Sequence, residues 1–159
     1  MDLQVLSTRE PTAYEQMLAA FESEDWAWKD ERAGCVQLDL SGQTGSWRCL
    51  ASVREDPAQF CFTSHVPSRV PVEKRPLAAE LLVRANHQLG MAYLSMDFAT
   101  GAVSCRTLLE VEHVRTQLTV EIIVRHVRYN LEAMDYYYAG IMALIHGDKQ
   151  PAEIMAGLP

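Results

Sequence analysis

The chain has 159 residues, of which 48% are hydrophobic and 22% charged, as is ordinary for a soluble globular protein. A chain of this length is expected to fold as a single domain, residues 1–159, around one sizeable core. Its 14 Lys and Arg stand against 21 Asp and Glu, a net charge of −7. Because nucleic-acid-binding domains carry a basic face, this balance argues against nucleic acid as a partner.

The N-terminal sequence and the longest apolar run both bear on where the protein resides. The first residues, MDLQVLSTREP, lack the basic and apolar regions of a signal peptide, and the longest apolar run, residues 139–145, is too short to cross a membrane. Four cysteines (Cys35, Cys49, Cys61 and Cys105) stand at wide, unequal intervals and are expected to be free, buried thiols. We therefore expect a cytoplasmic protein with no membrane partner.

The first third of the chain reads as one helix followed by short strands. Thr12 and Glu15 form a capping box at the start of a helix that ends near Asp25. The pair Trp26 and Trp28 marks the beginning of a strand. Apolar and polar residues then alternate over residues 36–41 and 47–54, and a shorter β-prone run covers 60–63.

A second helix and a hairpin follow between residues 71 and 109. Leucines recur at helical spacing from Leu77 to Leu89, and Gly90 ends the helix. Two β-prone runs, 91–98 and 102–109, flank a turn at Ala99-Thr100-Gly101. This helix is expected to lie on a sheet to which the hairpin also belongs.

The longest periodic segment begins after Thr119 and ends at Gly147. Its apolar seam is Val120, Val124, Val127, Leu131, Met134, Tyr138, Ile141 and Ile145. A helix of that length measures about 39 Å, whereas a seven-residue strand spans about 24 Å. The seam is therefore expected either to cross the sheet obliquely or to meet something else at its far end, for which a second copy of the chain is a candidate.

The order α-β-β-β-(β)-α-β-β-α predicts the α+β class, because runs of strands joined by short turns build an antiparallel sheet on which helices gather. Several segments also resemble YbjN-like proteins, bacterial proteins associated with sensory transduction. These segments are Trp47-Arg48-Cys49, Phe60 to Ser64, Val66-Pro67 to Lys74-Arg75, Arg84-Ala85-Asn86, Leu89-Gly90, Asp97 with Gly101, and Asp135-Tyr136-Tyr137.

The resemblance covers roughly residues 12–147 and is strongest over 71–107. It implies a twisted antiparallel sheet packed by helices, as in type III secretion chaperones, and assembly as a homodimer. It implies no catalytic residues, since the family offers none to carry over. His87 and Met91 depart from the small or polar residues expected at these positions.

Catalytic and metal-binding patterns are missing from the sequence. There is no glycine-rich phosphate loop, GxSxG, HExxH or CxxC, and the five histidines never stand two to four residues apart. We therefore expect no enzyme, no metal and no cofactor. The weak exception is Cys61 with His65, a nucleophile and base that could in principle meet.

Aromatic side chains are the candidates for partner binding: Trp26, Trp28, Trp47, Tyr136 and Tyr137. The competing interpretation is that these rings cover the edge of the core. A polar set, Arg84, Asn86 and Asp97, is interpreted as structural, with Arg84 pairing Asp97 and Asn86 bonding free backbone groups near the helix end. The same three residues could instead hold a ligand.

The leading functional hypothesis is a non-enzymatic module, chaperone-like or regulator-like, that binds a protein segment as a homodimer. An open sheet edge could accept an extended segment by strand addition. The alternative is a small-molecule-sensing regulatory domain with a pocket between the 71–90 helix and the sheet, lined by residues such as Arg84 and Asn86.

Overall fold

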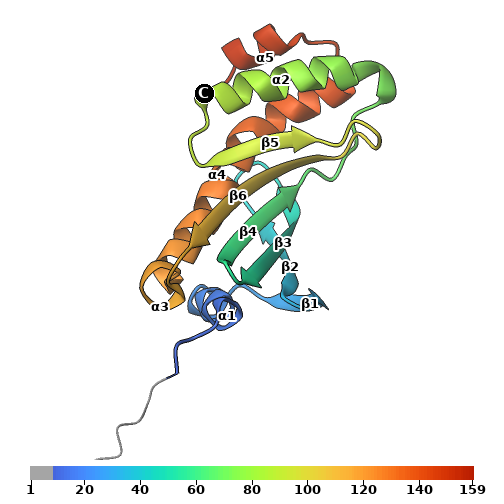
Figure 1. The fold of residues 1–159 in the computed structure, drawn as a ribbon. Helices are drawn as coiled ribbons and strands as arrows, with labels where there is room; N and C mark the ends of the chain where they lie inside the picture. The colour runs from blue at the N-terminus through green and yellow to red at the C-terminus, as the bar shows by residue number, and fades with distance from the viewer. Residues whose placement is uncertain (1–8) are drawn as a thin grey trace, which may run out of the picture.

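The computed structural model describes residues 9–159 (Figure 1). Residues 1–8, on which much of the signal-peptide prediction rests, lie outside this range. In chain order the elements are α1 (Ala13–Ser23), β1 (Trp28–Arg32), β2 (Cys35–Ser41), β3 (Ser46–Glu55), β4 (Ala58–His65), the 3-10 helix η1 (Val72–Lys74), α2 (Arg75–Gln88), β5 (Ala92–Met96), β6 (Val103–Val111), α3 (Val114–Gln117), α4 (Val120–His146) and α5 (Pro151–Ala156).

The strands form one six-stranded antiparallel sheet in the order β1-β2-β3-β4-β6-β5. The crossover between β4 and the β5–β6 hairpin contains α2. This arrangement confirms the predicted α+β class and the optional fourth strand of the first run. The short helix α3 was not predicted, because its four residues leave no periodic pattern.

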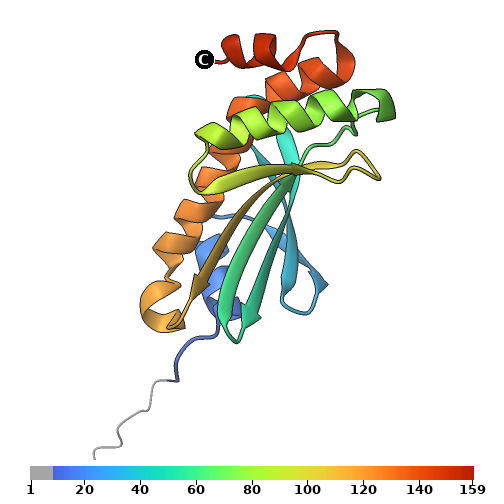
Figure 2. The same ribbon diagram turned by 45° about the horizontal axis from the view of Figure 1, so that its top comes forward.

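Alternate residues of the strands face opposite sides of the sheet. The register aligns Val36, Ala51, Phe62, Thr107 and Ala92 in one row, and all five are buried beneath helices. Figures 1 and 2 show α4 running along this side, with α1 near one end and α2 and α5 near the other. We call this side the helix face.

The next row lies on the other side of the same strands and consists of Lys29, Gln37, Leu50, Thr63, Arg106 and Tyr93. Within residues 9–159 no helix packs on this side. The helices that contact the sheet are α1 and α4, which lie on the helix face, and α2, which lies at the β5 edge. We call it the open face.

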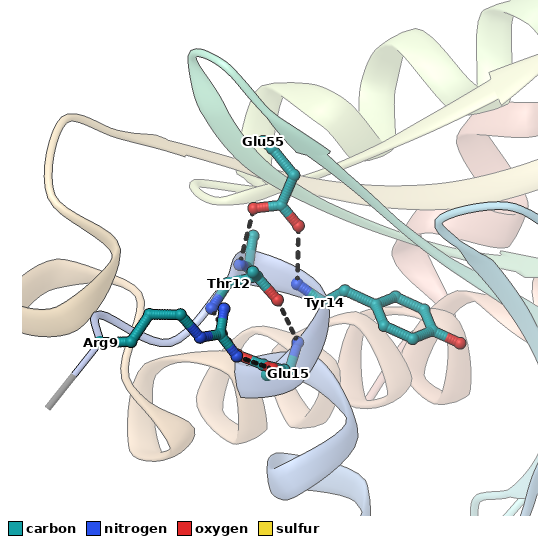
Figure 3. A network of polar contacts seen from close by, with 6 residues as sticks. Arg9, Thr12, Tyr14, Glu15 and Glu55 are labelled. Atoms are coloured by element: carbon teal, nitrogen blue, oxygen red, sulfur yellow. Dashed lines mark hydrogen bonds and ion pairs between the residues drawn. The ribbon is translucent and has the colours of Figure 1, made fainter.

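The first helix is fixed to the sheet through its N-terminus (Figure 3). The Thr12 hydroxyl accepts from the Glu15 N–H and the Glu15 carboxylate accepts from the Thr12 N–H, which confirms the predicted capping box. Glu55 at the end of β3 accepts from the backbone N–H groups of Ala13 and Tyr14, at 2.9 and 3.1 Å. These bonds satisfy the N–H groups that a helix start leaves without partners.

The far end of α4 is covered by the chain itself. Ile141, Leu144 and Ile145 are buried where α2 and α5 pack against α4. Gly140 lets α5 approach, because a Cβ at this position would come within 2.7 Å of the Ile154 side chain. The excess length of the seam is therefore hidden by α5, an element outside the predicted 12–147 core, and it does not require a second copy.

A lysine closes the same end of α4. The Lys74 ammonium donates to the carbonyls of Leu144, Ile145 and Gly147, at 3.1, 3.1 and 2.6 Å. These are carbonyls that the end of a helix leaves without backbone partners, and a cation there also complements the helix dipole. One side chain thus joins the crossover segment to the last turn of the long helix.

A buried amide attaches the middle of α4 to the helix face. Asn130 is fully buried; it accepts from the Ser64 hydroxyl at 2.6 Å and donates to the carbonyls of Phe62 and Cys105, at 3.2 and 2.9 Å. A polar side chain at such a place is tolerated because all three bonds are made.

Candidate functional site

The open face combines apolar, polar and charged side chains on a surface that the described chain leaves uncovered. Leu108 is 47% exposed and Tyr93 40% exposed, while Leu50 and Cys61 are half-buried between them and β2. Gln37 is only 7% exposed, and its amide nitrogen has no hydrogen-bond partner in the described structure. Such a mixture differs from the purely polar surface usual for the outer side of an antiparallel sheet.

Arginine and tyrosine meet at the β5–β6 side of this face. The Arg106 guanidinium lies 5.9 Å from the centre of the Tyr93 ring and donates to the Tyr93 hydroxyl at 3.3 Å. The contact orders both side chains without using all of the guanidinium donors. Arg106 has no carboxylate within ion-pair distance among residues 9–159.

A hollow of about 770 Å³ lies where β3 begins and the chain after β4 turns away from it. Its lining includes Arg48, His65, Arg69 and the buried Trp47. The Trp47 indole N–H and the His65 Nε2 are both buried without a partner in the described residues. Burial, followed by the nearby positive charge of Arg106, lowers the pKa of His65 and so favours the neutral form of the ring.

The β5 edge of the sheet is closed. The Asn86 side chain donates to the Leu94 carbonyl at 2.8 Å and accepts from the Leu94 N–H at 2.7 Å. These two backbone groups are the ones an added strand would use, so Asn86 takes the place of a neighbouring strand. Asn86 does bond free backbone groups, as predicted, but they belong to the strand beyond the helix and not to the helix end.

The other two members of the polar set are not joined to each other. Arg84 pairs with Glu80 one turn earlier on α2, at 2.8 Å, and not with Asp97. Asp97 accepts from the Thr100 hydroxyl and the Ala99 N–H, both at 2.9 Å, and these bonds lower the pKa of its carboxyl. Arg84 stands on the exposed side of α2 whereas Asp97 is turned into its own hairpin, so the predicted pair is wrong.

The five aromatic candidates are scattered, and two of them lie in the core. Trp47 and Tyr137 are 2% and 4% exposed, so their rings cannot reach a partner in this conformation. Trp47 packs edge-on against Tyr138, and the Tyr137 hydroxyl donates to Gln88 at 3.1 Å. The prediction of partner binding is corrected for these two, because Trp47 points from β3 to the helix face and Tyr137 lies on the buried side of α4, facing α2.

The remaining three aromatics are more accessible. Trp26 and Trp28 are half-buried against Phe21 of α1, with ring centres 6.1 and 6.3 Å from it. Tyr136 is 39% exposed on α4 and donates to the Pro159 carbonyl at 2.7 Å. Tyr136 lines a groove of about 550 Å³ between α4 and α5.

The loop between β2 and β3 is attached to α4 by one carboxylate. Asp135 accepts from the N–H groups of Gln43 and Thr44, at 2.7 and 2.6 Å, and from the Thr44 hydroxyl at 2.5 Å. Partial burial acts to raise the pKa of Asp135, but these hydrogen bonds outweigh it and the pKa is lowered. Asp135 is thus a structural member of the Asp135-Tyr136-Tyr137 segment.

Cys61 and His65 do not form a catalytic pair. Both stand on β4, where four residues of extended strand separate them by about 13 Å. All four cysteines are free, and burial raises the pKa of Cys49 and Cys105 to about 12. Among residues 9–159, no three His, Cys, Asp or Glu side chains come together in a way that could hold a metal ion, and no helix is long and apolar enough to cross a membrane.

The predicted pocket between α2 and the sheet is filled. Ala78, Leu81, Leu82 and Ala85 are buried on the inner side of α2, and the side chains of Arg84 and Asn86 are occupied by protein groups. Sequence periodicity located the helix correctly, but it could not show that small and branched side chains pack the inner side of α2 into the core.

Comparison with the solved structure of YbjN supports the resemblance at the level of the fold. The crystal structure of YbjN from E. coli, a proposed transcription regulator, aligns with a TM-score of 0.53 over 90% of this chain and 93% of that chain, at 16% sequence identity. The HopA1–SchA chaperone–effector complex aligns with a TM-score of 0.48 over 75% and 87%, at 14% identity. No protein-family model matches the sequence, and no curated protein matches it.

Sequence reasoning missed the open face as a site. Part of the signal was present, because Arg48 and Arg106 each stand between two residues that proved to be buried, whereas Lys29 and Arg54 do not. What was missing was the strand order, which brings these four residues from three strands onto one side.

Proposed function

We propose that this chain is a non-enzymatic protein-interaction module and that its open face receives a segment of another protein. The observation that carries the proposal is a sheet side with exposed Leu108 and Tyr93 that no element of residues 9–159 covers. Accessible aromatic and apolar side chains on a rigid sheet are typical of protein-recognition surfaces. Strand addition at β5 is disfavoured, because Asn86 and α2 already occupy that edge.

A matched pair of tyrosines tests the location. Tyr93 on the open face and Tyr136 on α4 are 40% and 39% exposed, so truncation removes the same ring from opposite sides of the molecule. Twelve-residue peptides are first selected from a displayed random library, and their affinity is measured by fluorescence anisotropy. We expect Tyr93→Ala to weaken binding about tenfold or more, as for a central aromatic contact, and Tyr136→Ala to leave it unchanged.

The reverse result would place the binding site in the groove between α4 and α5, where Tyr136 was a sequence candidate, and would refute the open face as the site. Selection of no peptide above the background of an unrelated sheet protein would refute the module itself. Trp26 and Trp28 serve as a further comparison, since they lie half-buried near α1.

The homodimer is proposed through η1 and α2, since the far end of α4 is covered internally. Val72 and Val83 are both 69% exposed, and with Pro76 and Ala79 they form an outward stripe at spacings of four, three and four residues. Apolar residues at such spacing suit helix-to-helix contact across a two-fold axis. Light scattering should give about twice the 17.9 kDa chain mass, and Val83→Glu should return the protein to one copy. A wild-type mass of one copy at all concentrations would refute the dimer.

A small-molecule regulator is the second candidate, and one observation favours it. The hollow beside β3 has the size of a ligand pocket and is lined by Trp47 and His65, each of which has a buried nitrogen with no described partner. Thermal-shift screening against metabolites separates the candidates, because a ligand of the native state raises the melting temperature by mass action. A metabolite whose effect disappears in Trp47→Phe would support the regulator; no shift with any metabolite would exclude it.

A further inference from the structure

We infer that the segment received by the open face is acidic and extended, with two carboxylates about six residues apart. The inference rests on the proposed function and adds the chemistry of the partner. It arises from how charge is distributed between the two sides of the sheet in an otherwise acidic chain.

Basic residues gather on the open face. The strand register places five of them there: Lys29, Arg32, Arg48, Arg54 and Arg106. The same register gives this face only two acidic residues, Asp39 and Glu110, and a third, Glu31, lies in the bulge beside Arg32. With the bulge residue counted on the face, five basic residues oppose three acidic ones there, whereas nine oppose eighteen in the rest of the chain.

Two of the five cations are neutralised locally. Arg48 lies 3.8 Å from Asp39, and Arg54 lies 3.1 Å from Glu110. Lys29, Arg32 and Arg106 have no carboxylate within 4.0 Å among residues 9–159. A partner that brings carboxylates to these three meets cations whose charge is not already used, and attraction between opposite charges guides such a partner to this side.

Two of the three unpaired cations, Lys29 and Arg106, lie in the same row across the sheet, four strands apart. Lys29 on β1 aligns with Gln37, then Leu50, Thr63 and Arg106 on β6. Four steps between neighbouring strands separate Lys29 from Arg106, which is about 19 Å. An extended chain advances about 3.3 Å per residue, so about six residues cover this distance. Residues i and i+6 also point to the same side of an extended chain, so both carboxylates can face the sheet.

The middle of the row suits the part of the segment between the carboxylates. Leu50 offers an apolar contact. The amide nitrogen of Gln37 has no described partner, and after rotation of the Gln37 side chain it could donate to a backbone carbonyl of the segment. Tyr93 extends the apolar contact beyond Arg106, against which its ring is held.

Three fluorescein-labelled peptides of twelve residues test the inference against the full chain. All have the same Val/Thr background; one carries Glu at positions 3 and 9, one carries Lys at positions 3 and 9, and one carries Glu at positions 3 and 4. We expect the first to bind about tenfold more tightly than the second and more tightly than the third, with affinity that falls as salt is added.

Charge reversals locate the contact. Lys29→Glu and Arg106→Glu should each weaken binding of the first peptide about tenfold and strengthen binding of the Lys peptide. Arg125→Glu is the matched control, because it makes the same change in net charge on the exposed side of α4 and should leave both affinities unchanged. Circular dichroism melts verify that each variant is folded before its affinity is compared.

Equal binding of the Glu and Lys peptides, with the loss on Tyr93→Ala retained, would overturn the acidic partner while the proposed function stands. Loss of Glu-peptide binding in Arg125→Glu would overturn the location. A single-stranded DNA 12-mer is also used as competitor. If it displaces the labelled Glu peptide at a lower concentration than the unlabelled Glu peptide does, the cations bind nucleic acid and the inference is overturned. Failure of every probe, including the library-selected peptides, would remove the proposed function as well.

Discussion

The helix face and the open face are made by alternate residues of the same strands, yet they differ in how their side chains are satisfied. On the helix face the core side chains are fully buried, and the one central amide, Asn130, makes three hydrogen bonds. On the open face three cations lack a carboxylate and one amide nitrogen lacks a partner among the described residues. The first face is complete within one chain, while the second retains bonding capacity that a partner can use.

Successive residues of a strand point to opposite faces, so residues that stabilise the fold alternate with residues that are available to a partner. A substitution on the helix face is expected to change the free energy of unfolding strongly, because it leaves a cavity or an unpaired polar group. A substitution on the open face is expected to change binding while stability changes little. Four predictions measure this separation.

The largest expected effect comes from removing a ring of the helix face. Phe62 is fully buried, so Phe62→Ala should lower the free energy of unfolding by about 3–5 kcal/mol in urea denaturation. The matched substitution on the open face, Leu108→Ala, should cost less than about 1 kcal/mol, because this side chain is already 47% exposed. Similar losses for the two variants would mean that the open face is covered in solution.

The next effect concerns the buried amide. Asn130→Leu should cost about 2–4 kcal/mol, because the Ser64 hydroxyl and the carbonyls of Phe62 and Cys105 would lose their partner in the core. Ser64→Ala is the control and should cost less, since Asn130 then keeps two of its three bonds. A gain in stability for Asn130→Leu would show that the amide serves only to specify the position of α4.

The end of α4 should be less sensitive. Lys74→Met keeps the aliphatic stem but leaves the carbonyls of Leu144, Ile145 and Gly147 without the ammonium. We expect a loss of about 1–3 kcal/mol in thermal or urea unfolding. Lys149→Met, at an exposed position just after the helix, is the control and should be neutral. An equal effect of the two would contradict a specific role for Lys74 at the helix end.

The smallest effect is a dependence on pH. Asp135→Asn should cost about 1 kcal/mol at neutral pH, because an amide cannot accept all three bonds from Gln43 and Thr44. The folded pKa of Asp135 lies below its ordinary value of about 3.9. Its contribution is therefore complete above pH 3.9 and is lost as the pH falls through the folded pKa. Unfolding free energies at several pH values should converge for wild type and variant in acid; a constant difference would refute the linkage.

The sequence predicted the elements that depend on local pattern and missed those that depend on contact between distant segments. The capping box at Thr12 and the hairpin around Gly101 follow from spacing along the chain. The seam of α4 was predicted in part, because four of its eight residues are buried and the other four are half-buried beside the core. Covering of the seam by α5 could not be predicted, because six residues around Ile154 carry no clear period. The prediction of an Arg84–Asp97 pair was wrong, because closeness in the sequence does not determine where two side chains point.

The candidate site was less predictable than the fold. Aromatic residues drew attention, although Trp47 and Tyr137 are in the core and only Tyr136 among the five is substantially exposed. The cations of the open face are spread over β1, β3 and β6 and become neighbours only through the strand order. A local pattern cannot report such an arrangement, because each strand contributes one or two residues to it.

The most direct test of the central claim is a map of amide chemical-shift changes in the ¹⁵N-labelled protein when the peptide with Glu at positions 3 and 9 is added. The account predicts that the largest changes fall on strand residues of the open face, above all Gln37, Leu50 and Arg106, and that α4 and α5 change little. Changes concentrated along α4 and α5 around Tyr136, with the strands unaffected, would contradict it.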